Sequence, residues 1–353
     1  MRTLVLLSLV CATSAYGAYM AYAAPTPADV DGLSAQDVTK AVAALKESFI
    51  QPDALSDTEL ERATLQGLLD HLAPEATLES GTAGAGAAAP FHAEDYEGKT
   101  GYLRPGALTN VNMARQTLED WSAKGIGAVV LDLRATTPSS DYDAAANLAA
   151  LFCAKGTEMF SLTAGKGRTI PGADSADGQT RTFTAEADPV FKGVLVVLVD
   201  GETAEAAETV ASALQKCAKA IVVGDKTAGR MFDYTDVPLG NATLRLAVAR
   251  VILPDGREPG ESGLEPDISV GLGTASKADV MASITSKGID SVTEEYDRPH
   301  LNEAALVAGS NPDLDELEAE QSGVNPLEVL IDQQLERALD LVTSISIFQQ
   351  RDK

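Results

Sequence analysis

Residues Gly127 to Arg134 read Gly-Ala-Val-Val-Leu-Asp-Leu-Arg and are the strongest indication of the fold in this sequence. A short apolar run of this kind is typical of a strand that is buried on both faces of a sheet. Two similar runs follow it, at Gly193–Val199 and Lys219–Gly224. Together, the three runs predict a sheet whose central strands are covered on both sides.

Segments with a helical spacing of apolar residues lie between these strands. Residues 143–152 and 204–217 show this spacing, and a strand at 100–104 with a helix at about 110–124 comes before the first run. Alternation of strands and helices favours right-handed crossovers around a mostly parallel sheet. We therefore predict an α/β fold, a mostly parallel sheet with flanking helices, followed by a β-rich excursion at Ala242–Leu253.

The segments on either side of this core differ from it in composition. Two short helices are expected over residues 41–49 and 59–72, the stretch Gly81–Ala89 has the composition of a flexible linker, and Pro326–Ile347 regains helical periodicity after an acidic stretch at 296–324. We expect a signal peptide at 1–24, a small N-terminal helical region at 25–80, a linker at 81–96, a core domain at 97–275, and an acidic tail with a C-terminal helix at 276–353.

The N-terminus has the form of a secretory signal. A positive start at Arg2 precedes an apolar stretch from Leu4 to Ala12, and the small residues Ala21 and Ala23 suit signal peptidase. We therefore expect an exported protein, periplasmic or extracellular, that associates with a membrane only if the signal is not cleaved.

Charge and histidine content exclude several kinds of partner. The formal net charge of −25, from 52 acidic and 27 basic residues, repels phosphate backbones, so nucleic acid is not expected as a partner. None of His71, His92 and His300 has a second His or a Cys at metal-ligand spacing. The sequence therefore predicts neither a metal nor another cofactor, and it leaves the oligomeric state open.

Cys153 and Cys217 both fall in apparent helices. Buried, unpaired thiols are the commoner outcome for two scattered cysteines, whereas an exported protein can bridge them. Because a disulfide depends on distance in space, the sequence leaves both outcomes open.

Several short motifs follow one another along the chain. They are Gly101-Tyr-Leu-Arg104, Val130-Leu-Asp-Leu-Arg134, Val197-Leu-Val199, Val222-Val-Gly-Asp-Lys-Thr-Ala-Gly229, Pro254-Asp-Gly-Arg257 and Gly263-Leu-Glu-Pro-Asp-Ile268. Taken in this order, they resemble the motifs of the C-terminal processing (tail-specific) serine peptidases of family S41. The resemblance covers roughly residues 97 to 272 and implies a tail-specific protease or crotonase-like α/β core. Members usually carry a PDZ domain before this core, but the gap between Pro74 and Gly101 is too short for one.

The resemblance also implies where the catalytic residues of the family would lie, and none is intact. The family motif Ser-Ala-Ser-Ala-Ser-Glu matches Thr203–Glu208, which places Glu205 at the position of the serine nucleophile. The position of the lysine base is occupied by Arg230, and that of a supporting glutamine by Tyr234. A glutamate is not acylated by an amide in the ordinary way, and an arginine, with a pKa above about 12, does not act as a base.

The oxyanion-hole region departs from the family pattern as well. The family sequence Asn-Asn-Pro-Gly-Gly corresponds to Ala135-Thr-Thr-Pro-Ser-Ser140, which has one extra residue and no glycine. Ser139, Ser140 and Ala206 are the candidate binding residues of this degenerate region. Because Glu205 and Arg230 replace residues that touch in active members, we expect the two to pair bidentately and fill the former site.

These departures favour a catalytically inactive protein with the peptidase fold, a pseudopeptidase with a peptide- or protein-binding or scaffolding role in the cell envelope. Such a binding module is expected to have an open apolar groove beside the strand Val129–Leu133. Peptides or proteins are the partners that the resemblance implies.

The alternative is an active serine-type peptidase with rearranged catalytic residues. Thr203 would then be the nucleophile, Lys226 the base, or Glu205 and Glu208 a pair of catalytic carboxylates. Each residue also has a simpler role, because threonine suits a helix N-cap, lysine a solvated loop, and glutamates the first turn of a helix. An active site of this kind requires a hydroxyl within hydrogen-bond reach of a base.

Overall fold

The computed structural model describes residues 32–51, 55–80, 89–258, 262–273, 275–293 and 330–351. The expected signal peptide, the first half of the expected linker and the acidic stretch at 296–324 lie outside these ranges. The chain divides into two units, residues 1–68 and residues 69–353, and each is described by itself. Within the described ranges, no helix combines the length and the apolar character that crossing a membrane requires.

The first unit contains helix α2 (Ala35–Ser48) and most of helix α3 (Asp57–Leu72). Ser34 caps α2, because its hydroxyl accepts a hydrogen bond of 3.3 Å from the Asp37 amide, as expected for an N-cap serine. Neither helix has a buried residue, although both carry apolar side chains at helical spacing. Both predicted helices are present, and α2 begins six residues before the predicted start.

A six-stranded sheet in the second unit contains the predicted apolar runs. Its strand order is β11-β8-β7-β4-β3-β2, and every pairing is parallel except that of β2 with β3. All five residues of β4 are buried, because β3 and β7 pair with its two edges and helices cover both faces. The strands are β2 (His92–Tyr96), β3 (Thr100–Arg104), β4 (Ala128–Asp132), β7 (Val194–Val199), β8 (Ile221–Gly224) and β11 (Ile268–Ser269).

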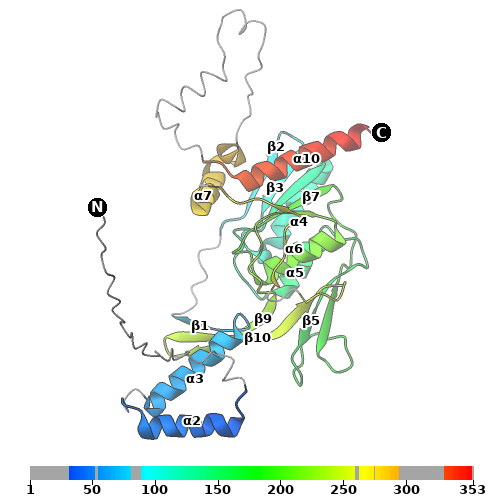
Figure 1. Cartoon of the computed structure of the whole chain (residues 1–353). Helices are drawn as coiled ribbons and strands as arrows, with labels where there is room; N and C mark the ends of the chain where they lie inside the picture. The colour runs from blue at the N-terminus through cyan, green and yellow to red at the C-terminus, as the bar shows by residue number, and fades with distance from the viewer. Residues whose placement is uncertain are drawn as a thin grey trace, which may run out of the picture. The chain divides into compact units, whose positions relative to one another are not determined.

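Helices cover this sheet on both sides. On one side, helices α4 (Val111–Lys124), α5 (Tyr142–Ala149) and α6 (Glu205–Cys217) pack against alternate strand residues such as Val129. On the other side, α7 (Lys277–Lys287) and α10 (Gln333–Arg351) pack against the intervening residues, such as Val130. In Figure 1, α10 runs above strands β3 and β7, and α5 and α6 lie below them. Two short 3-10 helices, η2 (Leu108–Asn110) and η4 (Ile289–Val292), lie next to α4 and α7 in the sequence.

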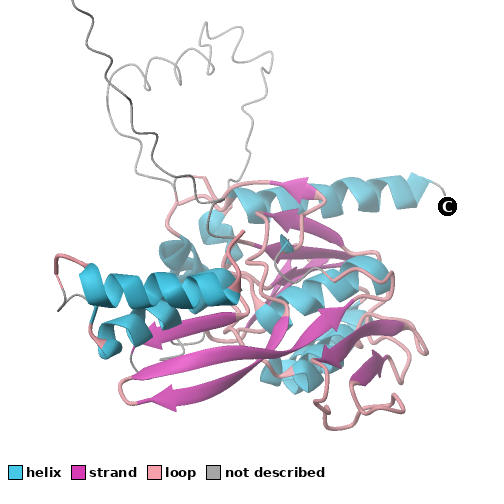
Figure 2. Ribbon diagram, turned by 60° about the horizontal axis from the view of Figure 1, so that its bottom comes forward, coloured by secondary structure: helices cyan, strands magenta, loops and turns pink. Residues whose placement is uncertain are grey.

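The second sheet has five strands and is antiparallel throughout, with the order β1-β10-β5-β6 and β9 paired to β10. The expectation of a mostly parallel sheet is therefore not confirmed for the core as a whole (Figure 2). One reason is the tight turn after Leu239, where Gly240 has a φ of +65° and reverses the chain into a hairpin. The strands are β1 (Ala76–Ser80), β5 (Glu158–Ala164), β6 (Thr180–Thr184), β9 (Phe232–Leu239) and β10 (Ala242–Ile252).

Core elements extend beyond the boundaries expected from the sequence. β1 falls in the expected N-terminal helical region, and β2 falls at the end of the expected linker. The predicted C-terminal helix is α10, which starts at Gln333 and buries Leu335, Ala338 and Val342 in the core. This helix is therefore part of the core of the second unit.

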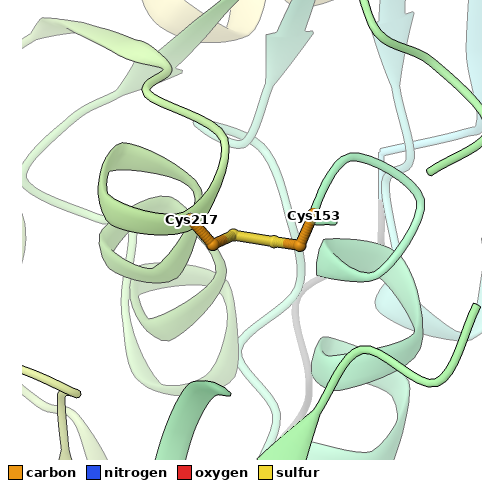
Figure 3. The surroundings of a disulfide bond; sticks show 2 residues. All are labelled: Cys153 and Cys217. Atoms are coloured by element: carbon orange, nitrogen blue, oxygen red, sulfur yellow. A yellow bond between two sulfur atoms is a disulfide. The ribbon is translucent and has the colours of Figure 1, made fainter. Parts of the chain in front are cut away.

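Cys153 and Cys217 form a disulfide, which decides between the two outcomes that the sequence left open (Figure 3). Their Cα atoms lie 5.3 Å apart, within the usual range for a disulfide. The bond ties the loop after α5 to the last residue of α6. It therefore anchors the C-terminal end of the helix whose N-terminal end carries Glu205.

Candidate functional site

The first residue of helix α6 has an unusual backbone conformation. Glu205 has a φ of +56°, in the left-handed region that residues other than glycine rarely adopt. The N-cap residue, Ala204, provides no side-chain hydrogen bond to the helix. Strain of this kind costs on the order of 1–3 kcal/mol and occurs preferentially at functional sites. The fold therefore presents residue 205 in a strained conformation at a helix N-terminus.

The carboxylate of Glu205 is buried and paired with an arginine from the second sheet. Its Oε2 lies 3.0 Å from Nη2 of Arg245, and the Glu205 side chain is only 1% exposed. Arg245 also lies within 4 Å of two further carboxylates, Glu79 at 3.9 Å and Asp236 at 3.6 Å. Burial raises the pKa of Glu205, and the positive charges of Arg245 and Arg230 oppose this only in part.

The expected bidentate pairing of Glu205 with Arg230 is wrong, because Arg245 takes that place. Arg230 instead belongs to a loop that is tied to the second glutamate of α6. Oε2 of Glu208 accepts a bond of 3.0 Å from the Arg230 amide, and Oε1 accepts a bond of 2.9 Å from the Gly229 amide. The hydroxyl of Thr227 also donates to Glu208. Glu208 is therefore an anchor for this loop, and burial raises its pKa.

The backbone of the predicted oxyanion region is hydrogen-bonded to α6. The amide of Ala206 donates to the carbonyl oxygen of Ser139 at 3.1 Å. The hydroxyl of Ser140 accepts a bond of 3.1 Å from the Tyr234 amide, and that of Ser139 accepts one of 3.0 Å from Asp141. The structure therefore brings the predicted site residues Ala206, Ser139, Ser140 and Tyr234 together. In this arrangement the Ala206 amide is already bonded within the protein.

Tyr234 lies against the ion pair of Glu205 and Arg245. The Arg245 guanidinium carbon lies 4.8 Å from the centre of the Tyr234 ring, a cation–π contact. The phenol donates a hydrogen bond of 3.1 Å to the carbonyl oxygen of Pro74. Burial, and then the negative charge of Glu205, raise the pKa of Tyr234 to about 12. The phenol is thus protonated at neutral pH and connects the site to the segment before β1.

Thr203 and Lys226, the nucleophile and the base of the alternative arrangement, each contact a different partner. The Thr203 hydroxyl donates to the carboxylate of Asp200 at 3.1 Å, but Thr203 is 1% exposed and closes a turn with that residue. It is not the N-cap of α6, since Ala204 holds that position. Lys226 forms a surface ion pair of 2.7 Å with Glu265. A substrate would therefore not reach the Thr203 hydroxyl without opening of the turn.

A cavity of about 600 Å³ opens beside the loop of Arg230, at the carboxyl end of β4. Both edges of β4, beside which the sequence predicts an open apolar groove, are paired with β3 and β7. The cavity is lined by Ala89, Arg134, Ala135, Thr136, Thr137, Pro138, Gly201, Glu202, Arg230, Lys277, Ala278 and Met281.

Sequence reasoning missed two contributors to this region, Arg245 and the N-terminus of α7. Both come from segments outside the motifs of the catalytic site. The run Ala242–Ala249 is apolar apart from Thr243 and Arg245. The single arginine in this otherwise apolar strand could have drawn attention to Arg245. The sequence could not show which carboxylate Arg245 contacts.

The chain is similar in sequence to known proteins over part of its length. Residues 99–270 match the family model described as Peptidase family S41. The carboxy-terminal-processing protease of Bartonella bacilliformis is 31% identical over 181 residues, which cover 49% of this chain and 39% of that protein. The chloroplastic C-terminal processing peptidase of Tetradesmus obliquus is 28% identical over 251 residues, which cover 68% of this chain and 50% of that protein. The chain thus spans half or less of the length of these two relatives.

Among solved structures, the photosystem II D1 C-terminal processing protease matches with a TM-score of 0.39 and 24% sequence identity. The match covers 56% of this chain and 48% of that protein. A lipoprotein from Streptococcus agalactiae matches with a TM-score of 0.44 and 14% identity, covering 70% of this chain and 94% of that one.

Proposed function

Because residues 99–270 form a domain of peptidase family S41, we propose that the chain uses this fold to bind peptides or proteins and does not hydrolyse them. The observation that carries the proposal is the buried ion pair of Glu205 and Arg245. By the resemblance of residues 203–208 to the family motif, Glu205 stands where the nucleophilic serine would be. A paired carboxylate at that position takes the place of a reactive hydroxyl.

Three parts of the family's chemistry are replaced at this site. Glu205 bears no hydroxyl that could be acylated. Arg230, at the position of the base, stays protonated in any ordinary protein environment. The Ala206 amide, which would stabilise the oxyanion of a tetrahedral intermediate, is bonded to Ser139. Loss of the nucleophile, the base and a free oxyanion donor together supports a protein without peptidase activity.

A binding role is supported by the cavity beside Arg230. It lies just beyond the carboxyl end of β4, the edge at which open α/β sheets usually bind ligands. Its volume of about 600 Å³ is in the range of small-ligand and peptide side-chain sites. The relatives are named as proteases that process protein C-termini, and this makes peptides or proteins the natural class of ligand.

The same proposal places the protein in the cell envelope or outside the cell. Disulfides persist mainly in oxidising compartments, and Cys153 is bonded to Cys217. The sequence of residues 1–24 has the form of a secretory signal. A periplasmic or extracellular location agrees with both observations.

Binding is tested with a permanently unfolded protein, for example a globular protein that has been reduced and blocked with iodoacetamide. This unfolded protein carries a fluorescent label, and its fluorescence anisotropy is measured as the purified chain, without residues 1–24, is added. We expect saturable binding, with the labelled protein intact at the end of the titration. Absence of binding up to high micromolar concentrations of the chain would contradict the proposed role.

A further inference from the structure

The cavity beside Arg230 contains polar groups that have no partner within the described part of the chain. The Arg230 guanidinium forms no ion pair there, and its Nε is buried without a hydrogen bond. Thr136 lines the same cavity and is 6% exposed, and its hydroxyl oxygen also lacks a partner. Buried donors of this kind are normally satisfied, so two in one cavity point to a ligand that accepts hydrogen bonds.

The other cations of the cavity wall are already neutralised. Nζ of Lys277 lies 2.6 Å from Asp200 and 2.7 Å from Glu202, which is the acidic residue of the cavity wall. Arg134 lies between two carboxylates, with Nη2 2.7 Å from Oδ2 of Asp132 and 2.7 Å from Oδ2 of Asp332. Neither side chain has a positive charge to spare for a ligand.

The two carboxylates nearest to Arg230 have other partners. Oε2 of Glu205 is bonded to Arg245, while its Oε1 has no hydrogen-bond partner in the described part of the chain. Glu208 is bonded to the amides of Gly229 and of Arg230 itself. Burial raises the pKa of both carboxyl groups and the positive charge of Arg230 opposes this, but among the described residues neither forms an ion pair with its guanidinium. Arg230 is therefore the cation of the cavity wall that remains free to bind a ligand.

The N-terminus of helix α7 faces the same cavity. Lys277 and Ala278, the first two residues of this 11-residue helix, line the wall, and the N-cap residue Ser276 makes no side-chain hydrogen bond to the helix. The first amides of a helix are unsatisfied within the helix and favour an anion. The helix terminus and Arg230 thus favour the same kind of ligand from two sides.

We propose that this cavity binds the carboxylate of a peptide, held by the guanidinium of Arg230 and by the first-turn amides of α7. A single free cation matches a monovalent anion better than a phosphate dianion, and guanidinium binds a carboxylate bidentately. The carboxylate comes either from a free C-terminus or from an aspartate or glutamate side chain. This inference rests on the proposed peptide-binding function and specifies its ligand.

Three acetylated peptides separate these sources. The first is acetyl-Ala-Ala-Ala-Ala with a free C-terminal carboxylate, the second is the same peptide as its amide, and the third is acetyl-Ala-Ala-Glu-Ala amide. Their affinities are measured by isothermal titration calorimetry at low salt. We expect at least one carboxylate peptide to bind about tenfold or more tightly than the neutral amide, as charge-assisted hydrogen bonds provide.

The Arg230→Met variant keeps most of the side-chain volume and removes the charge, so it should erase this preference. Arg230→Lys keeps the charge but not the bidentate geometry, and should retain a smaller preference. The matched control is Arg250→Met. Arg250 is a half-exposed residue of β10 that pairs with Glu258, and its removal should leave the preference unchanged. Melting temperatures of all variants establish that they are folded.

Two results would overturn the inference. One is equal affinity for all three peptides in the wild type, and the other is a carboxylate preference that survives in Arg230→Met. In either case, binding of the unfolded protein would still support the proposed function. If no peptide and no unfolded protein binds, the proposed function fails together with the inference.

Discussion

Oε2 of Glu205, the first residue of α6, lies 3.0 Å from Nη2 of Arg245, in the middle of β10. The two residues are 40 positions apart in sequence, and their ion pair connects α6, which packs on the six-stranded sheet, to β10 of the second sheet. It is the central contact of the site. Because Glu205 is almost fully buried, its charge depends on this arginine for compensation.

Removal of Arg245 should therefore destabilise the chain strongly. The Arg245→Met variant leaves a buried carboxylate without its partner, and we expect a loss of about 3 kcal/mol in the free energy of unfolding. The double variant Glu205→Leu with Arg245→Met should recover much of this loss, since both charges are then absent. Urea denaturation measures each value. A single variant as stable as the control Arg250→Met would show that the pair contributes nothing.

The stability that Glu205 contributes should depend on pH with a definite sign. Its pKa in the folded chain is raised above the ordinary value of 4.5, so the folded state holds this proton more tightly than the unfolded state. The stabilising contribution is complete below the unfolded pKa and is lost as the pH rises through the folded pKa. The wild type should therefore lose stability relative to Glu205→Gln as the pH increases above about 4.

Urea denaturation of the two proteins from pH 4 to pH 8 provides this comparison. Glu119→Gln, on an exposed position of α4, is the matched control for loss of one carboxylate. If the wild type became more stable relative to Glu205→Gln as the pH rises, the raised pKa of Glu205 would be contradicted.

The prediction from sequence succeeded where the pattern is local. The runs that became β4, β7 and β8 are continuous and apolar, and strands buried on both faces need only such a run. The edge strand β2 was missed because its sequence, His-Ala-Glu-Asp-Tyr, is mostly polar and resembles a loop. The strand is formed by its pairing with β3, which no local signal reveals.

The candidate site was predicted in part for the same reason. Glu205, Ala206, Ser139, Ser140 and Tyr234 lie close together in the structure, and the roles that the resemblance gives them stay predictions. The partner of Glu205 was not foreseen. Its identity depends on how the antiparallel hairpin of β9 and β10 lies over α6, and this is a property of tertiary packing.

The disulfide should provide a large share of the stability of the second unit. Its two cysteines are 64 residues apart in sequence, and closing a loop of that length stabilises a fold by about 4 kcal/mol on the chain-entropy model. The Cys153→Ser and Cys217→Ser double variant should unfold at a correspondingly lower urea concentration. Dithiothreitol should lower the midpoint of the wild type and leave that of the double variant unchanged. A wild-type midpoint that resists complete reduction would contradict this prediction.

The docking of α10 should depend on a buried charge network. Arg134 is bonded to Asp132 and to Asp332, the residue that precedes α10, and its side chain is 1% exposed. Asp332→Asn removes one of these charges, and we expect the free energy of unfolding to fall by about 3 kcal/mol. In this variant, backbone amides should exchange with solvent faster in α10 than in the central strand β4. The exposed Asp340, replaced by Asn, serves as the control on the same helix. Equal exchange rates in the two variants would contradict a role of Arg134 in docking.

The most direct test of the account is cleavage of an unfolded protein by the purified chain, followed by mass spectrometry over many hours. A carboxy-terminal-processing protease such as that of Bartonella bacilliformis serves as the active reference. We expect the reference to produce fragments, while this chain leaves the substrate intact at equal concentration. Fragments that form in proportion to the concentration of this chain, and that disappear in a Thr203→Val variant, would contradict the central claim that the chain binds peptides or proteins without hydrolysing them.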